Sequence, residues 1–228
     1  MPDEPVSAVD GWKRIWFAAT AATVLVGLVI QAGVVATNDA GVFPTVPGRI
    51  FNMFCYFTVQ SNVLVGITTL LLALQPDRPS TLFRAARLAG LAGIIVTCIV
   101  YHAAISHLLE LDGWALAADN LLHTVVPVMA VAGWLLYGPR GMTSARIAIL
   151  AAIYPVCWMA FTLIRGPIVD WYPYHFIDVT TLGYGKVALN SVWVAILFLG
   201  VSAGATALDA RLPRPASERA IPEAELRV

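Results

Sequence analysis

Residues 87–108 read RLAGLAGIIVTCIVYHAAISHL, and this stretch decides the fold. After Arg87 it contains no Lys, Arg, Asp or Glu. A helix of about 20 mainly apolar residues spans the roughly 30 Å of hydrocarbon in a bilayer. The stretch therefore predicts a transmembrane helix.

Five further apolar runs have similar lengths, at residues 15–36, 51–75, 119–137, 145–165 and 186–208. Charged residues make up 12% of the chain, whereas soluble domains contain about 25%. We therefore expect an all-α integral membrane bundle of six transmembrane helices over residues 15–208. A cytoplasmic tail at 1–14 and a disordered cytoplasmic tail at 209–228 should flank it.

The basic residues are divided unequally between the two sides of this predicted bundle. Three lie in loops on one side: Arg49, Arg165 and Lys186. Cytoplasmic loops carry an excess of Lys and Arg, so we expect a multi-pass protein of the inner (plasma) membrane with both termini cytoplasmic. The eleven basic residues on the cytoplasmic side are Lys13, Arg14, Arg78, Arg84, Arg87, Arg140, Arg146, Arg211, Arg214, Arg219 and Arg227.

Polar side chains within the predicted helices gather in the outer half of the membrane. The inner halves hold no Asn, Gln, His or charged residue except at their boundaries. Because polar groups in lipid are costly, they usually face the bundle interior or a wet cavity. We favour an outer-leaflet cavity over hydrogen bonds that only hold helices together, since packing alone would not avoid the inner leaflet. The layer includes Gln31, Thr58, Gln60, Ser61, Asn62, Tyr101, His102, Asp119, Asn120, His123, Asn190 and Ser191.

Thr58 and His123 are the candidate catalytic pair, because a hydroxyl beside a histidine is the minimum for a nucleophile with its general base. Counted from the apolar runs, Thr58 lies about 10 Å deep and His123 about 6 Å deep. Asp119 either orients the imidazole or caps the helix, and a nearby helix N-terminus favours a neutral imidazole. Asn62 shares a helix face with Thr58 and is a candidate donor to an oxyanion.

Several alternatives stay open. A membrane threonine most often bonds the carbonyl one turn back on its own helix. Ser61 is a second candidate nucleophile, and Cys55 a third, although a cysteine in apolar surroundings stays a thiol. Side chains that could bind the polar part of a substrate are Ser61, Asn62, Asp119, Asn120, His102 and Asn190.

Pro127 should disturb the helix beside the candidate histidine. Proline has no N–H to donate to the carbonyl one turn back, which belongs to His123. We expect this carbonyl to find another partner and the helix to kink there.

Three segments resemble the androgen-induced membrane protein family: FTVQSN at 57–62, DNLLHTVVP at 119–127 and WYP at 171–173. They are also similar to bacterial six-span relatives of that family. The animal members are multispanning hydrolases of fatty acid esters of hydroxy fatty acids, with a threonine nucleophile and a histidine. The resemblance implies that Thr58 is the nucleophile and His123 its partner. The residues QSN after Thr58 depart from the animal pattern and are closer to the bacterial branch.

These observations lead to one main hypothesis, a lipid-ester hydrolase acting in the outer leaflet on a lipid or fatty acid ester. Acyl transfer to another lipid is an alternative, as is a small transporter or membrane regulator, although transporters usually show internal repeats. We expect no cofactor and no metal, because the histidines lack the spacing of metal ligands. The zero net charge gives no indication of nucleic-acid binding, and the partner we expect is the bilayer.

Overall fold

The structure, a computed structural model, describes residues 8–39, 41–75 and 80–213. Six helices in this part of the chain are long and apolar enough to span a membrane, which confirms the predicted all-α bundle. The spans are Gly11–Thr37, Phe57–Leu74, Thr81–Leu108, Gly113–Tyr137, Ala145–Val169 and Val179–Asp209. Their elements are α1 (Ala8–Thr37), α3 (Phe57–Leu74), α4 (Thr81–Val100), α5 (Gly113–Asn120), α6 (Val126–Tyr137), α7 (Ala145–Val169) and α8 (Val179–Asp209).

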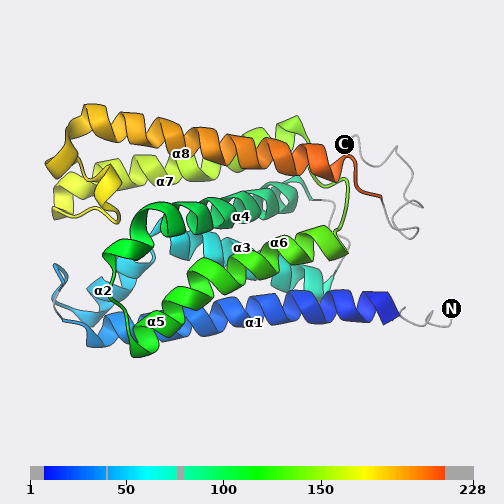
Figure 1. Cartoon of the computed structure of the whole chain (residues 1–228), viewed down its shortest axis with the longest axis horizontal. Helices are drawn as coiled ribbons and strands as arrows, with labels where there is room; N and C mark the ends of the chain where they lie inside the picture. The colour runs from blue at the N-terminus through cyan, green and yellow to red at the C-terminus, as the bar shows by residue number, and fades with distance from the viewer. Residues whose placement is uncertain (1–7, 40, 76–79, 214–228) are drawn as a thin grey trace.

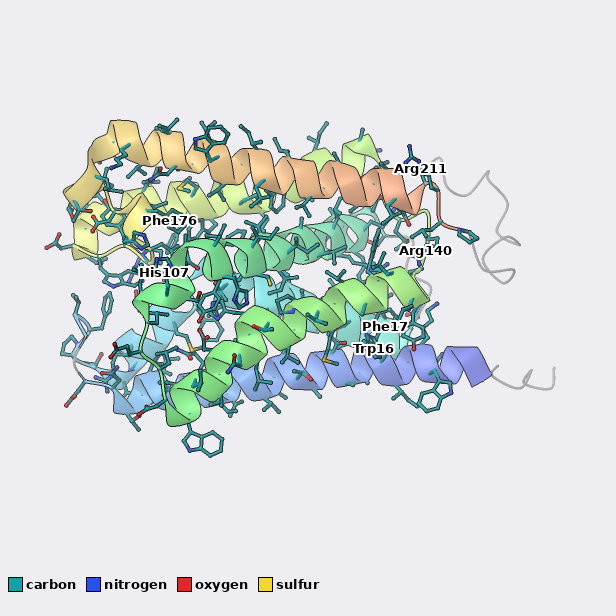
Figure 2. All side chains as sticks on the ribbon, viewed as in Figure 1. Trp16, Phe17, His107, Arg140, Phe176 and Arg211 are labelled. Carbon is teal, nitrogen blue, oxygen red and sulfur yellow. The ribbon has the colours of Figure 1, made fainter. Side chains whose placement is uncertain are left out.

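The bundle has two distinct ends (Figure 1). Helix α1 begins and α8 ends at the same end, which we call the terminal end. The opposite end carries residues 38–39, 41–56, 101–112 and 170–183, and we call it the site end. Arg140 and Arg211 lie at the terminal end, whereas His107 and Phe176 lie at the site end (Figure 2). An even number of spans therefore places both described ends of the chain on one side.

The helix boundaries differ from those expected at both ends of the chain. Helix α1 begins at Ala8, so residues 8–14 of the predicted tail are helical. Helix α8 ends at Asp209, where the second tail was expected to begin. Residues 1–7 and 214–228 of the two predicted tails lie outside the described residues.

The predicted helix over 51–75 is in fact two helices. The short α2 (Val46–Met53) starts at Thr45, whose side chain accepts a hydrogen bond from the Gly48 N–H. It ends before a turn at 54–56, and α3 begins at Phe57. The turn consists of Phe54, Cys55 and Tyr56, with no charged residue, glycine or proline, so hydropathy gave no sign of the break.

Small residues allow the helices to approach closely around the site, as is common in membrane bundles. A Cβ on Gly27 of α1 would lie 2.8 Å from the Leu122 side chain. A Cβ on Gly93 of α4 would lie 2.7 Å from the Ser61 hydroxyl oxygen. Helix α1 therefore packs closely against the segment that carries His123, and α4 packs closely against α3, which carries Thr58.

Two membrane spans contain a π-helical turn near the site end, η1 (Tyr101–Ile105) and η3 (Leu121–Val125). A short 3₁₀ turn, η2 (Ser106–Leu108), follows η1, and another, η4 (His175–Ile177), precedes α8. Single π turns widen a helix locally and often occur at functional sites. Here η1 contributes Tyr101 and η3 contributes His123.

Candidate active site

Two cavities meet at Thr58. The polar cavity, of about 700 Å³, lies at the site end, and its wall includes Gln31, Asp119 and His123. The apolar pocket, of about 460 Å³, lies between α4, α7 and α8. Four residues line both of them: Thr58, Tyr101, Ile105 and Tyr174. A hydroxyl at this boundary can reach a group that has a polar part in one cavity and a hydrocarbon part in the other.

Thr58 differs from the other threonines of the bundle in its hydrogen bonds. Its hydroxyl oxygen lies 3.1 Å from the Tyr174 hydroxyl oxygen, which also accepts the Thr58 N–H at 3.2 Å. Thr58 is the second residue of α3, so no helical carbonyl lies one turn behind it. Threonines that instead donate to a carbonyl one turn back are Thr20, Thr23, Thr37, Thr68, Thr69 and Thr206. The expectation drawn from membrane threonines in general is therefore wrong for Thr58.

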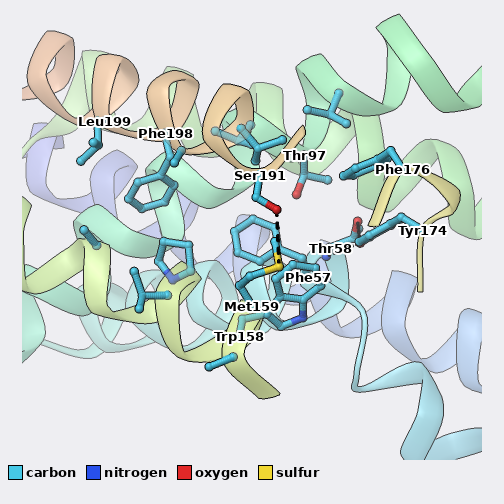
Figure 3. A pocket seen from close by; sticks show the side chains of 18 of the residues that line it. Phe57, Thr58, Thr97, Trp158, Met159, Tyr174, Phe176, Ser191, Phe198 and Leu199 are labelled. Carbon is cyan, nitrogen blue, oxygen red and sulfur yellow. Dashed lines mark hydrogen bonds between the residues drawn. The ribbon is translucent and has the colours of Figure 1, made fainter. Parts of the chain in front are cut away.

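Tyr174 comes from the loop between α7 and α8 and is held among aromatic rings. Its ring stacks on Phe176 at 5.3 Å between centroids and meets Tyr56 edge to face at 5.6 Å. Burial raises the pKa of Tyr174, so its phenol is neutral at physiological pH and can both donate and accept. Figure 3 shows Tyr174 and Thr58 together at one end of the apolar pocket.

His123 is oriented by a carboxylate. Its Nδ1 lies 3.0 Å from Asp119 Oδ1 and 3.2 Å from the Asp119 carbonyl oxygen. Both are acceptors, so the assigned tautomer carries its proton on Nδ1. Tyr101 donates a short hydrogen bond to Asp119 Oδ2 and stacks on the imidazole at 3.9 Å between centroids. Nε2 has no hydrogen-bond partner among the described residues, so its lone pair can accept a proton.

The helices that carry Asp119, His123 and Thr58 begin at other residues than predicted, which changes the position of each residue within its helix. Asp119 lies inside α5, whose N-cap is Asp112, so the prediction that it caps the helix is wrong and the orienting role stands. His123 is ten residues past the first residue of α5, which removes the expected effect of a helix N-terminus. The helix starts from which the depths were counted also differ, because α3 begins at Phe57 and α5 at Gly113.

Asn62 connects the segments that carry Thr58 and His123. In η3 the Val126 N–H donates to the Leu121 carbonyl, five residues back. In this register Pro127 fails to supply a donor to the Leu122 carbonyl, rather than to that of His123 as predicted. Asn62 Nδ2 fills the gap, 3.2 Å from the Leu122 carbonyl oxygen and 2.9 Å from that of Thr58. Both amide hydrogens are used, and Asn62 lines neither cavity, so its predicted oxyanion role is wrong.

The two alternative nucleophiles lie away from both cavities. Ser61 is fully buried, with its hydroxyl 3.0 Å from that of Tyr154. Cys55 is buried beside the Phe51 carbonyl, 3.5 Å away. Burial raises the pKa of the Cys55 thiol, as expected for an unreactive cysteine. Neither residue lines the polar cavity or the apolar pocket.

The remaining predicted substrate-binding residues are also outside the two cavities. His102 Nε2 lies 3.1 Å from the Thr124 hydroxyl, and Asn120 is exposed on α5. Asn190 donates to the Phe176 carbonyl at 2.7 Å, which fastens η4 to α8. Of the predicted substrate-binding residues, only Asp119 lies with Thr58 and His123 in the wall of the polar cavity. Gln31 and Tyr101 of the predicted polar layer also line it.

Tyr174 was missed by the sequence reasoning. It stands in the aromatic segment WYPYHF at 171–176, which suggested only a position at the membrane surface. The one available signal was a polar hydroxyl among rings in the longest loop, and its partner on α3 is 116 residues away. Contacts at this separation depend on the packing of α7 and α8, which hydropathy does not specify.

Comparisons with models of protein families, with curated proteins and with solved structures found no match to this chain.

Proposed function

We propose that this chain is an intramembrane hydrolase of fatty acid esters, with Thr58 as the nucleophile and His123 as its general base. The observation that supports this most strongly is the position of Thr58, in the wall of the polar cavity that contains His123 and at one end of the apolar pocket. The resemblance of the segments around both residues to the androgen-induced membrane protein family points to the same pair.

In the first half of the proposed reaction, Thr58 Oγ1 attacks the ester carbonyl carbon while His123 Nε2 takes the hydroxyl proton. No hydrogen bond joins the two side chains among the described residues, so a water molecule must relay the proton across the polar cavity between them. The tetrahedral intermediate then expels the alcohol, which receives the proton from His123. Asp119 holds the imidazole and stabilises its positive charge.

In the second half, water attacks the acyl-threonine with His123 again as the base, and the fatty acid leaves as Thr58 regains its proton. We assign the oxyanion donor to Tyr174 rather than Asn62. Its neutral phenol lies 3.1 Å from Thr58 Oγ1, beside the position that the reacting carbonyl would occupy.

We further propose that the site end faces the outside of the inner membrane. The support is the distribution of charge, because seven of the ten basic residues that the structure describes lie toward the terminal end. A reaction at the site end would then use esters of the outer leaflet.

Labelling with a lipophilic fluorophosphonate tests this assignment. The purified chain in detergent should be modified at Thr58, and His123→Ala should abolish the labelling. Thr58→Ala should lower kcat/KM for a fatty acid ester at least about 1,000-fold. Ser61→Ala and Cys55→Ser are the matched controls, because both groups lie close in sequence and outside the cavities, and both variants should keep full activity. Full activity in Thr58→Ala, or labelling at Ser61, would disprove the assignment.

A further inference from the structure

Beyond the end where Thr58 lies, two hydroxyl residues line the apolar pocket, Thr97 and Ser191, and the Ser191 hydroxyl donates to the Val187 carbonyl at 2.7 Å. The rest of the pocket wall is formed by aliphatic and aromatic side chains such as Val96, Val156, Phe198 and Leu199. A phospholipid headgroup or a sugar would leave its polar atoms unpaired there, at a cost of several kcal/mol in water-free surroundings. Only a hydrocarbon fits this lining.

The pocket is elongated, and Thr58 lies at one of its ends. Figure 3 places Phe198 and Leu199 at one end and Thr58 and Tyr174 at the other. Its lining runs from Ser191 to Leu199 on α8, about 12 Å of helix at 1.5 Å per residue. An extended chain advances about 1.2 Å per backbone bond, so roughly ten carbons can lie in this length.

The pocket opens toward lipid between α7 and α8. Its floor is formed by α4, where Val96 and Thr97 are 2% and 6% exposed. Its rim is formed by Val156 on α7, which is 66% exposed, and Leu199 on α8, which is 52% exposed. Surfaces of a transmembrane bundle at this position face acyl chains, so a chain can enter from the side without crossing water.

We propose that the apolar pocket binds one acyl chain, which enters sideways between α7 and α8 with its carbonyl end at Thr58. This inference rests on the proposed function, because the chain is the acyl part of the ester that Thr58 attacks. Transfer from lipid to the pocket changes little in hydrophobic free energy. Binding should therefore depend on how well the length of a chain matches the length of the pocket.

Photo-crosslinking tests the pocket without any turnover. The full chain in phosphatidylcholine nanodiscs would be irradiated with a twelve-carbon fatty acid that carries a diazirine near its methyl end. Labelling should map to the pocket residues of α4, α7 and α8. Excess dodecanoic acid should suppress it. Labelling spread evenly over lipid-facing residues, without competition, would overturn the proposal.

Blocking variants sharpen the test. Ala195→Trp places a large ring in the pocket lining, and it should reduce labelling and kcat/KM for a dodecanoyl ester at least tenfold while sparing an acetyl ester. Ala203→Trp is the matched control, on an exposed position of α8 outside both cavities. If Ala195→Trp does not fold, Ala195→Leu should give a smaller loss in the same direction.

The outcomes separate the two proposals. Competed labelling of the pocket in a chain that hydrolyses no ester would disprove the hydrolase and leave the acyl site. Hydrolysis that depends on Thr58, with labelling unchanged in Ala195→Trp, would disprove the acyl site and leave the hydrolase.

Discussion

The two ends of the bundle use polar groups in different ways. At the terminal end, side chains bond to a loop: Arg84 donates to the Met142 carbonyl at 2.9 Å, and the Thr143 hydroxyl donates to Asp209 at 2.8 Å. At the site end, some polar side chains also bond backbone carbonyls, but others bond one another around a cavity, as His123 and Asp119 do at 3.0 Å. The first arrangement closes helix ends and supports stability. The second leaves atoms such as His123 Nε2 facing a cavity, where a substrate can reach them.

The helices themselves differ in the same way. The site end contains both π turns, the break between α2 and α3, and a bend in α8 at Gly183, where φ is +72°. Each irregularity frees backbone groups or turns a side chain toward a cavity. If the comparison is correct, substitutions at the site end should alter activity more than stability, and those at the terminal end should do the reverse.

The largest effect is expected for Asp119→Asn. The amide group of asparagine would donate to Nδ1 and shift the imidazole proton to Nε2, so His123 could no longer accept a proton from Thr58. We expect kcat to fall about 100- to 10,000-fold, with the melting temperature in detergent nearly unchanged. Esterase kinetics and thermal unfolding of the same preparation give the two readouts, and an active Asp119→Asn would show that the carboxylate does not orient the base.

An intermediate effect is expected when Asn62 is replaced. Asn62→Leu removes the donor to the Leu122 carbonyl, and an unpaired buried carbonyl costs about 1–3 kcal/mol. Because η3 carries His123, we also expect kcat/KM to fall roughly tenfold, a loss of about 1.4 kcal/mol in the transition state.

A double-mutant cycle with Pro127→Ala makes this prediction specific. Alanine restores an N–H at position 127, which can donate to the Leu122 carbonyl in place of Asn62. The loss of stability caused by Asn62→Leu should therefore be smaller in the Pro127→Ala background than in the native chain. Equal losses in both backgrounds would mean that Asn62 acts through some other contact.

The smallest effect on activity is expected at the terminal end. Thr143→Val removes the hydroxyl that donates to Asp209 and keeps the size of the side chain. We expect the free energy of unfolding to fall by about 1 kcal/mol and kcat/KM to stay within twofold. A large loss of activity here would break the division between the two ends, because it would couple the terminal end to the site.

Much of the fold could be predicted from the sequence, because each span is long and apolar and its hydropathy does not depend on its neighbours. The break before Phe57 could not, since Phe54 and Tyr56 are as apolar as a helix interior. For η3, Pro127 correctly predicted that one carbonyl of the helix lacks its usual donor. The sequence did not show which carbonyl this is, because that depends on the helical register. The contact between His123 and Asp119 could be predicted from their four-residue spacing on one helix. The contact between Thr58 and Tyr174 could not, because it depends on tertiary packing.

One phenolic oxygen has a mechanical consequence. The Tyr174 hydroxyl oxygen bonds the Thr58 hydroxyl, accepts the Thr58 N–H at the start of α3, and belongs to a side chain that lines both cavities. One oxygen atom therefore both caps the first turn of α3 and holds the Thr58 hydroxyl at the boundary of the two cavities. The loop that carries Tyr174 thus fixes the position of the proposed nucleophile, although the two residues belong to different parts of the chain.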